Sequence, residues 1–365
     1  MKIGITGASG QIGWHLRCHL AAHKEEEVCL AGRETFSDSG ALDRFVSGLD
    51  VLIHLAGVNR GPENEVEQVN RELADRLIAA LNRTGARPHL VFSSAISQAH
   101  HAAYGRAKRY CSEQFSAWSQ HSGAGFANVI LPHVFGEHGR PFYNSVVHTF
   151  CHQLAHNDSP VIEQDNTLHL VHAQAVAAEL LRAGRERVTG DLEIAGTSVK
   201  VSELLHLLGR LAGEYEQNII PDLRDPLTLA LFNTYRSYLY PKHFPLDLKR
   251  HSDERGDLFE LVKELNGGQV YVSTTKPGIT RGNHFHSRKF ERFIVLQGKA
   301  NIRLRRMFSN EVLEFIVDGD QPQVLDIPTL HAHNLTNIGQ SELLTLFWSH
   351  EIFDPITPDT IRAEV

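Results

Sequence analysis

The chain has few cysteines and no excess of positive charge. Only four of its 365 residues are cysteines, and no two of them have the CxxC spacing of thiolate zinc or redox sites. The four are Cys18, Cys29, Cys111 and Cys151. A disulfide framework is therefore not expected. The formal net charge of −7 also argues against a nucleic-acid binder, because there is no basic surplus to neutralise phosphates.

Long apolar runs are absent as well. No stretch approaches the roughly 18 apolar residues of a membrane span, and the chain opens in a short apolar segment and glycines instead of a signal peptide. With so little cysteine, these features predict a protein of the reducing cytoplasm. Hydrophobic residues make up 42% of the chain and charged residues 22%, as in ordinary globular proteins, and the length predicts more than one domain.

Before Tyr238, short apolar runs alternate with amphipathic stretches. The runs are bounded by glycine or turn residues, which is typical of buried parallel strands, whereas the stretches have helical periodicity. The predicted strands are 2–5, 28–31, 51–55, 90–92 and 128–131, and the clearest helices are 65–83 and 106–120. This alternation of strand and helix predicts a doubly wound α/β sheet.

The pattern changes after Tyr238. Residues 240–245 (YPKHFP) contain two prolines and are typical of a linker. The region that follows has almost no helical periodicity, and many short strands there predict an all-β sandwich or small barrel. The predicted strands are 269–274, 290–296, 300–305, 313–317 and 343–348. We therefore expect two domains, residues 1–243 and 244–365.

A glycine-rich loop follows the first predicted strand. Residues 3–13 read IGITGASGQIG, so the loop joins a strand to a helix. Glycines there allow a tight turn and let the backbone approach a pyrophosphate, which the N–H groups at the start of the helix then bind. A glycine triplet alone is weak evidence, but its place at the start of an α/β pattern favours a dinucleotide site. The expected cofactor contacts are Gly7, Ser9, Gly10, Gln11, Ile12 and Gly13.

The ends of the next two strands bear on the choice of cofactor. The second strand ends at Arg33, where an acidic residue would bind the ribose 2′-hydroxyl of NAD. Arginine suits a 2′-phosphate, so we expect NADPH; the alternative is that Arg33 is merely solvated, and Glu34 lies beside it. Leu55, Ala56 and Gly57 end the third strand, where small residues leave room for the cofactor or form a simple packing turn.

Tyr104 and Lys108 form a Tyr-x-x-x-Lys pair in the sequence YGRAK. Residues four apart share one face of a helix, so the lysine ammonium would lie beside the phenol and stabilise a phenolate. Such a tyrosine can protonate a carbonyl oxygen while hydride arrives from a nicotinamide, and Lys108 can also bind the nicotinamide ribose. By chance the pair is common on surfaces. Here it follows Ser93 and Ser94, and a serine hydroxyl at a strand end could hold the same carbonyl oxygen.

The segments TGASGQIG, LAG, FSS and YGRAK, in this order, resemble an extended short-chain dehydrogenase/reductase. The resemblance implies a Rossmann-type domain in which Tyr104 is the acid, Lys108 is its partner and Ser94 supplies the hydroxyl. Some family members place the serine one residue later, where this chain has Ala95, and Ser93 remains an alternative.

A histidine-rich pattern lies in the strand-rich region. Residues 278–298 match G-x5-H-x-H-x4-E-x6-G at every fixed position, as in cupin barrels. His284 and His286 are two apart on a strand and face one side, and Glu291 comes from the next strand. A second element, in which His333 has the required spacing to Pro328 and to an asparagine, supplies a third histidine. Three imidazoles and one carboxylate suit Zn, Fe, Mn or Ni, and zinc is the metal we expect.

The second element departs from the usual pattern. It has Leu330 where glycine is usual, and His331 adds a competing histidine; the spacing to Pro328 and Asn337 favours His333. The alternative to a metal site is a barrel that keeps these residues and holds no metal.

The whole chain resembles the bifunctional enzymes of bacterial capsule and O-antigen synthesis that make the UDP-N-acetyl-L-fucosamine precursor. The segments that carry this resemblance are HLAGVNR (54–60), RPFYNS (140–145), DERGDLFE (253–260), KPGITRGNHFH (276–286) and FDPITPDT (353–360). It implies that the cupin epimerises C3 of a UDP-2-acetamido-2,6-dideoxy-4-hexulose and that the reductase domain then reduces C4 with NADPH, to a UDP-2-acetamido-2,6-dideoxy-L-talose-type product.

The implied chemistry is consistent, because a 4-keto group acidifies the neighbouring C3–H and is then the hydride acceptor. Lys276 and His286 are candidates for the epimerase base, although a metal-bound histidine would not be free to act. In the reductase, His133 stands where the family usually has asparagine near the sugar. Arg140, Tyr143 and Asn144 are expected substrate contacts, or else they pack a loop.

Three alternatives remain at this point. The first keeps the reductase and makes the cupin a non-catalytic binding and dimerisation module. The second makes the chain a non-catalytic NADP sensor, and the third makes the cupin a dioxygenase attached to an unrelated reductase. An intact Tyr104 and Lys108 argue against the sensor. A homodimer is expected by analogy with other cupins.

Overall fold

The computed structural model describes residues 1–23, 26–95, 102–248, 251–253, 256–258, 262–264, 266–351 and 353–365. Their contacts divide the chain into two units, one of residues 1–149 and 161–204 and the other of residues 150–160 and 205–365. Within the described residues, no helix is long and apolar enough to cross a membrane. The segment DERGDLFE lies partly outside the described residues, at 254–255 and 259–260.

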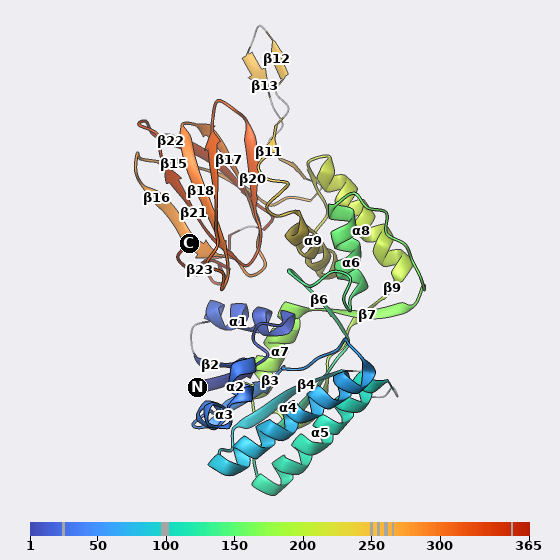
Figure 1. The fold of residues 1–365 in the computed structure, drawn as a ribbon. Coiled ribbons are helices and arrows are strands. Elements are labelled where there is room, and N and C mark those ends of the chain that lie inside the picture. Colours follow the sequence, from blue (N-terminus) through green and yellow to red (C-terminus); the bar gives the residue numbers. More distant parts are fainter. Residues whose placement is uncertain are drawn as a thin grey trace. The chain divides into compact units, whose positions relative to one another are not determined.

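The first unit is built on a six-stranded parallel sheet (Figure 1) with the order β2-β1-β3-β4-β5-β8. Its strands are β1 (Lys2–Thr6), β2 (Glu27–Ala31), β3 (Val51–His54), β4 (His89–Ala95), β5 (Phe126–Leu131) and β8 (Gly190–Glu193). The chain runs from β1 to β2 on one side and places β3 on the other side of β1. This change of direction creates a crevice at the carboxyl ends of β1 and β3, which is where open α/β sheets bind ligands.

Helices cover both faces of this sheet. One core joins Ile3, Ile5 and Val91 of the sheet to α1 (Gln11–His23) and α7 (Ala173–Arg185). The other joins Leu90 and Phe92 to α4 (Glu63–Thr84) and α5 (Ala103–Ser122). Two short helices, α2 (Arg33–Ser37) and α3 (Ser39–Val46), follow β2, and a small sheet of β6 (His133–Phe135), β7 (Thr167–His172) and β9 (Thr197–Lys200) completes the unit. The prediction of a doubly wound α/β domain is confirmed.

The second unit contains most of α6 (Val146–Ala155) and α8 (Val201–Glu216), all of α9 (Pro226–Leu239), and the strand-rich region. Two five-stranded antiparallel sheets have the orders β11-β20-β17-β22-β15 and β19-β18-β21-β16-β23. Their strands are β11 (Leu246–Asp247), β15 (Gln269–Thr275), β16 (Thr280–Phe285), β17 (Glu291–Gln297), β18 (Lys299–Arg306), β19 (Val312–Asp318), β20 (Gln323–Ile327), β21 (His331–Asn337), β22 (Leu343–Ser349) and β23 (Ile361–Arg362). Two strand pairs, β10 (Ile219–Ile220) with β14 (Lys263–Glu264) and β12 (His251–Asp253) with β13 (Gly256–Leu258), lie outside them. The prediction of an all-β cupin-like domain is confirmed.

A buried ionic network fastens α8 and α9 to the barrel. Arg292 on β17 donates two hydrogen bonds to Asp326 on β20, at 2.7 and 3.0 Å, and both side chains are fully buried. Tyr215 on α8 donates a hydrogen bond to the same carboxylate. Arg236 on α9 lies 4.2 Å over the ring of Phe290, next to β17. These contacts cross the residue 243/244 boundary expected from the sequence, so both helices pack as part of the barrel unit.

Candidate functional site

The glycine loop lies directly against the loop that follows β3. Gly7 has a φ of +70°, and a Cβ there would lie 2.6 Å from the backbone nitrogen of Ala56. A Cβ on Gly13 would lie 2.3 Å from the carbonyl oxygen of Gly7, so neither position accepts a side chain. The Thr6 hydroxyl ties the two loops together because it accepts hydrogen bonds from the backbone N–H groups of Leu55 and Ala56, both at 3.2 Å. The structure thus brings residues 7–13 and 55–57 together at the crevice.

The helix that begins at Gln11 is held by its first side chain. The Gln11 amide donates to the carbonyl of Gly136, at 3.1 Å, and to Nε2 of His148, at 2.9 Å. The backbone N–H of Gly136 reaches the same His148 nitrogen at 3.3 Å. Burial lowers the pKa of His148 to about 4, which keeps the ring neutral. The Gln11 side chain therefore holds the start of α1 against residues 136 and 148. Of its neighbours, Ser9 and Gly10 are exposed, and Ile12 is half-buried beside the sheet core.

Arg33 is the first residue of α2 and directly follows β2. Its side chain is exposed, and no ion-pair partner for its guanidinium is found among the described residues. Because β2 is the neighbour of β1, Arg33 stands at the same carboxyl edge of the sheet as the glycine loop. A cation at this edge that has no ion-pair partner among the described residues is available for an anionic group.

Tyr104 and Lys108 lie one turn apart at the start of α5. The Lys108 ammonium donates to the carbonyl of Ser93 at 2.7 Å and lies 4.6 Å above the ring of Phe92. It is 5.6 Å from the centre of the Tyr104 ring. The lysine is only 4% exposed and Tyr104 is half-buried, so this is no ordinary surface pair. A buried ammonium beside a phenol is an arrangement that stabilises negative charge on the phenol oxygen.

The two candidate serines lie on opposite faces of β4, since side chains alternate along a strand. Ser94 is on the face of Leu90 and Phe92, which α5 covers. Ser93 is on the other face, and its hydroxyl donates to the carbonyl of His54 at 3.4 Å. Of the two, Ser94 therefore shares its side of the sheet with the helix that carries Tyr104 and Lys108.

The expected substrate contacts fall into two groups. Tyr143 lies between two guanidiniums, those of Arg140 at 5.0 Å and Arg60 at 5.7 Å from its ring centre. Arg60 also donates to the carbonyls of residues 142 and 143, and Asn144 donates to the carbonyl of Asn59 at 3.3 Å. The loops 54–60 and 140–145 are thus joined, with two cations on one tyrosine. His133 lies apart from them on β6, where it accepts a hydrogen bond from the backbone of β7.

The barrel gathers the four predicted metal ligands. Ligand atoms of His284, His286, Glu291 and His333 all lie within 4.8 Å of one another. His284 on β16 pairs directly with His333 on β21, next to a bulge at residues 282–283, where both residues have positive φ. His286 follows β16, and Glu291 opens β17 in the other sheet. The cluster is therefore assembled from both sheets.

Two of these imidazoles are oriented by a hydrogen bond from Nδ1, the ring nitrogen that points away from the cluster. Nδ1 of His286 donates to the carbonyl of Asp359 at 2.6 Å, and Nδ1 of His333 donates to the carbonyl of His331 at 3.1 Å. In a neutral ring, each Nε2 then carries a lone pair. These nitrogens face one oxygen of Glu291 at 3.0 and 3.6 Å, and Nε2 of the His333 ring has no hydrogen-bond donor. Three acceptors that converge in this way suit a shared cation.

The charge states fit a cation as well. Burial lowers the pKa of His284 to about 3, and burial also lowers the pKa of His333. Burial by itself would raise the pKa of Glu291, but the close approach of His286 and His333 outweighs it, so the pKa lies well below its usual value. Neutral imidazoles and an ionised carboxylate are the forms that bind divalent metals.

Residues around the cluster include some that local spacing did not single out. The Tyr271 hydroxyl donates to Glu291 at 2.8 Å, and the buried Lys289 ammonium lies 3.4 Å from the same carboxylate oxygen. Lys276, by contrast, is exposed. His331 is outside the cluster; its Nδ1 donates to the carbonyl of Thr329 and its ring lies 6.0 Å from that of Tyr240.

Leu330, which stands where such motifs usually have glycine, has a φ of +60° and is fully buried. The position thus keeps the left-handed backbone that explains a usual glycine. Its N–H donates to the carbonyl of His286 at 2.8 Å, which ties the two metal-binding elements together.

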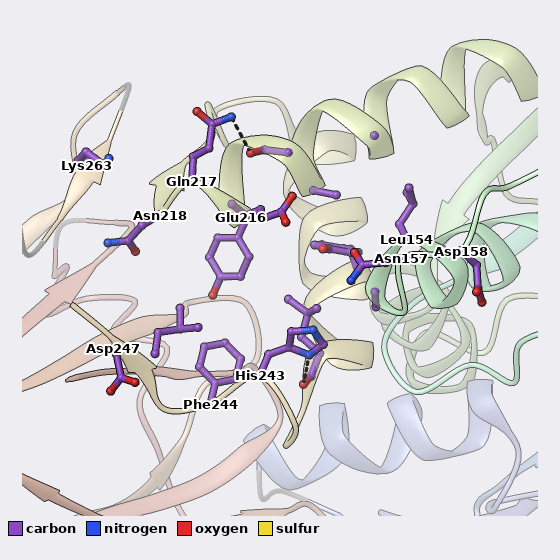
Figure 2. A pocket seen from close by; sticks show the side chains of 18 of the residues that line it. Leu154, Asn157, Asp158, Glu216, Gln217, Asn218, His243, Phe244, Asp247 and Lys263 are labelled. Carbon is purple, nitrogen blue, oxygen red and sulfur yellow. Dashed lines mark hydrogen bonds between the residues drawn. The ribbon is translucent and has the colours of Figure 1, made fainter. Parts of the chain in front are cut away.

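The second unit also has a cavity of about 730 Å³ (Figure 2) between the ends of α6 and α8 and the segment before β11. Apolar side chains such as Leu154 and Phe244 line it together with the carboxylates of Asp158, Glu216 and Asp247. None of the four cluster residues lines this cavity, so it is separate from the metal cluster.

Comparison with known proteins also distinguishes an N-terminal and a C-terminal part of the chain. Residues 3–194 match the NAD dependent epimerase/dehydratase family, and residues 251–361 match the polysaccharide biosynthesis C-terminal domain. The chain is 31% identical to UDP-2-acetamido-2,6-beta-L-arabino-hexul-4-ose reductase of Pseudomonas aeruginosa, over 100% of this chain and 99% of that protein.

Solved structures show the same relationship. The capsular polysaccharide assembling protein CapF of Staphylococcus aureus is 31% identical, with a TM-score of 0.64 and full coverage of both chains. A UDP-N-acetylglucosamine 4-epimerase of Bacillus cereus, at 17% identity and a TM-score of 0.55, covers 66% of this chain and 96% of its own, and shows the fold alone. The chain therefore belongs to the NAD dependent epimerase/dehydratase family and carries a polysaccharide biosynthesis C-terminal domain behind its Rossmann-type domain.

Proposed function

We propose that this protein is a bifunctional nucleotide-sugar enzyme of the cytoplasm. Its barrel epimerises C3 of a UDP-2-acetamido-2,6-dideoxy-4-hexulose, and its N-terminal domain reduces the C4 ketone with NADPH to a UDP-2-acetamido-2,6-dideoxy-L-talose-type product. The observation that carries the proposal is that one chain holds both a Tyr104–Lys108 pair with a buried lysine and a four-ligand cluster, and is similar over its whole length to a UDP-sugar reductase. The four cysteines are free, which suits a reducing compartment.

The residues at the crevice fit a dinucleotide. The backbone of residues 7–13 and the start of α1 would hold the pyrophosphate, residues 55–57 would lie beside it, and Lys108 would bind the nicotinamide ribose. Bound NADPH would supply the hydride. Arg33 would hold the 2′-phosphate; an Arg33→Ala variant should bind NADPH about tenfold more weakly and bind NADH unchanged, as measured by fluorescence titration. Equal losses for both cofactors would contradict this role.

In the reduction, Tyr104 would donate its phenolic proton to the C4 oxygen. Lys108 would stabilise the phenolate that remains, and the hydroxyl of Ser94 would hold the same oxygen in place. Arg140, Tyr143 and Asn144 would contact the nucleotide sugar, and we add Arg60, because it fixes the loop that presents them. His133 would contact the sugar from β6.

In the epimerisation, His284, His286, Glu291 and His333 would hold a divalent metal, with zinc expected. Such an ion would act as a Lewis acid toward the ketone oxygen and so favour transfer of the C3 proton to a base, for which Lys276 is the candidate. A proton returned to the other face of C3 would complete the epimerisation. The convergence of unprotonated Nε2 atoms on the Glu291 carboxylate supports this assignment.

The test is incubation with the 4-hexulose in heavy water, with and without NADPH. We expect deuterium at C3 without cofactor, and NADPH oxidation when cofactor is added. Tyr104→Phe should abolish only the oxidation of NADPH. Glu291→Gln should abolish the deuterium uptake, and it should oxidise NADPH only when it is given the C3-epimerised ketone. Absence of both activities in the wild-type protein would refute the proposal.

A second candidate role for the barrel is dimerisation, and one observation favours it alongside catalysis. β15 lies at the edge of its sheet, and Val270 and Val272, two apart on one face, are 54% and 56% exposed. An exposed apolar edge strand is a surface that a second copy can cover. We therefore propose a homodimer through this edge. A Val270→Lys/Val272→Lys variant should be monomeric in light scattering, and if it keeps the wild-type mass this interface is wrong. If Glu291→Gln leaves deuterium uptake intact, the barrel is a binding module only.

A further inference from the structure

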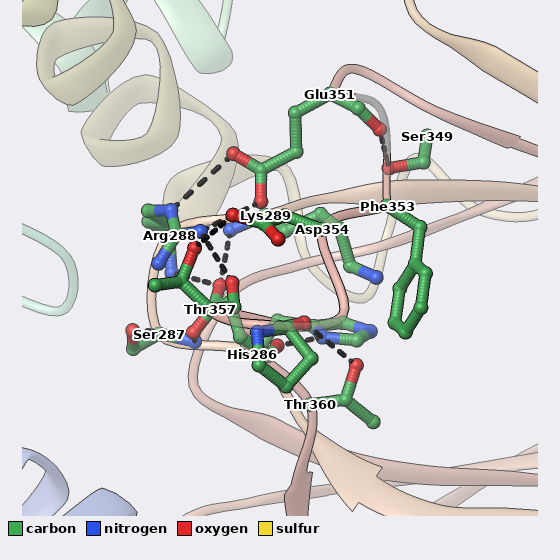
Figure 3. A network of polar contacts seen from close by, with 12 residues as sticks. His286, Ser287, Arg288, Lys289, Ser349, Glu351, Phe353, Asp354, Thr357 and Thr360 are labelled. Atoms are coloured by element: carbon green, nitrogen blue, oxygen red, sulfur yellow. Dashed lines mark hydrogen bonds and ion pairs between the residues drawn. The ribbon is translucent and has the colours of Figure 1, made fainter.

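The C-terminal segment 353–363 lies across the turn that joins two of the cluster residues (Figure 3). β23 adds to the edge of the sheet beside β16, with His284 opposite Arg362. The backbone N–H of Ala363 also donates to the carbonyl of Asn283 at 3.0 Å. The end of the chain is therefore in contact with the strand that carries the first histidine of the cluster.

One residue of this segment, Asp359, binds the whole turn between His286 and Glu291. Its carboxylate accepts hydrogen bonds from the backbone N–H groups of Ser287, Arg288 and Lys289, at 2.8 to 2.9 Å, and from the Ser287 hydroxyl at 2.6 Å. Its own carbonyl accepts the Nδ1–H of His286 at 2.6 Å. Four donors on one carboxylate leave this turn little freedom.

The backbone at Asp359 is itself constrained. Its φ of +35° lies in a region that non-glycine residues rarely adopt, and the side chain is only 8% exposed. Such a conformation persists when the surrounding contacts over-determine it. Here it lets one residue present its carbonyl to His286 and its carboxylate to the next three residues at once.

We propose that Asp359 is a positioning residue of the metal site, an inference that rests on the proposed metal-binding function. The Asp359 carbonyl fixes the His286 tautomer with Nε2 toward the other ligands. The carboxylate fixes the turn and so sets the separation of His286 and Glu291. Outer contacts of this kind change metal affinity roughly 10- to 100-fold.

The same segment offers a matched control in Asp354. Its carboxylate accepts hydrogen bonds from its own turn, from the N–H of Ile356 and the hydroxyl of Thr357, both at 2.8 Å, and from the N–H of Thr357. It lies in the network of Figure 3, where these hydrogen bonds and the charge of Arg288 lower its pKa, but among the described residues it accepts no hydrogen bond from the backbone of residues 286–289. Changing Asp354 therefore perturbs the segment without releasing His286.

The experiment measures Zn²⁺ affinity of the full-length protein by competition with a chromophoric chelator. Asp359→Gly removes the carboxylate and tolerates the positive φ, so it should weaken Zn²⁺ binding about 10- to 100-fold. Asp359→Asn keeps one acceptor oxygen and should lie between it and the wild type. Asp354→Asn should bind Zn²⁺ like the wild type. Bound Co²⁺ should show altered visible bands in Asp359→Gly, because its ligands move.

The outcomes separate this inference from the function on which it rests. If the wild type binds no Zn²⁺, the proposed metal site fails. If the wild type binds Zn²⁺ and Asp359→Gly binds it equally well, Asp359 does not position the site. Equal weakening by Asp354→Asn would likewise overturn the assignment to Asp359. If Asp359→Gly does not fold, a wild-type affinity in Asp359→Asn is the result that overturns it.

Discussion

The role of Lys108 can be tested by removing its charge. Its ammonium lies 5.6 Å from the centre of the Tyr104 ring, inside a site where the lysine is only 4% exposed. With the phenolate charge placed at the ring centre and an effective dielectric constant of about 20, the ammonium stabilises this charge by about 3 kcal/mol. Loss of this interaction in the transition state corresponds to a roughly hundredfold lower rate. Lys108→Met should therefore lower kcat for NADPH oxidation about a hundredfold.

The assay follows the loss of NADPH absorbance with the C3-epimerised ketone at saturating cofactor, so that weaker ribose binding does not mask the effect on kcat. Lys108→Arg, which keeps the charge, should retain more activity than Lys108→Met. Arg106→Met is a matched control, since Arg106 lies on the same helix and pairs with Glu67 instead. If Lys108→Met kept a third or more of the wild-type kcat, the charge would not serve the chemistry and the reasoning would be refuted.

Three further predictions concern cofactor binding and stability. Gly13→Ala should weaken NADPH binding at least about tenfold in a titration. Gly10→Ala, whose Cβ would lie 3.3 Å from the Gly7 oxygen, should weaken NADPH binding less. Equal effects would contradict the loop geometry. Asp326→Asn should lower the free energy of unfolding in urea by about 3–5 kcal/mol, because it leaves a buried guanidinium unpaired. Asp318→Asn, at an exposed ion pair, should lower it by less than about 1 kcal/mol. Similar losses in the two variants would refute the burial argument. Burial lowers the pKa of His15 to about 4, of His54 to about 3 and of His148 to about 4. The stability from these neutral rings is therefore fully present above the histidine pKa of the unfolded chain, about 6.5, and falls as the pH drops from there toward 4, by up to about 1.4 kcal/mol per histidine and pH unit. Unfolding curves that do not change between about pH 7 and pH 5 would exclude this.

The sequence was most informative where the signal is local. Four of the five predicted strands of the first sheet lie within β1, β2, β4 and β5, and the fifth, 51–55, runs one residue past β3. This agreement arises because buried parallel strands are short apolar runs bounded by turns. The spacing of His284, His286 and Glu291 follows from strand alternation and a single turn, so these ligands could be named before the barrel was known.

Contacts between segments that are far apart in the chain leave no local pattern in the sequence. The short strands β6, β7 and β9 form a sheet without continuous apolar runs, and they were not predicted. Arg60 meets the 140–145 loop across more than 80 residues, and Asp359 meets the 286–289 turn across about 70. No periodicity links such positions. The segments 58–60 and 353–360 carry a family resemblance, but nothing in their sequence indicates the distant residues that they contact.

The network around Asp326 has a consequence for how this protein can be divided. Arg236 and Tyr215 precede the linker at residues 240–245. The Asp326 carboxylate, which accepts hydrogen bonds from Arg292 and Tyr215, follows this linker. A reductase half released by cutting at 243/244 would lose this anion and expose the aromatic surface around Phe232, which packs on Phe290. Gene fission at that point would therefore yield an insoluble fragment, and separating the halves would require redesign of α8 and α9 as well.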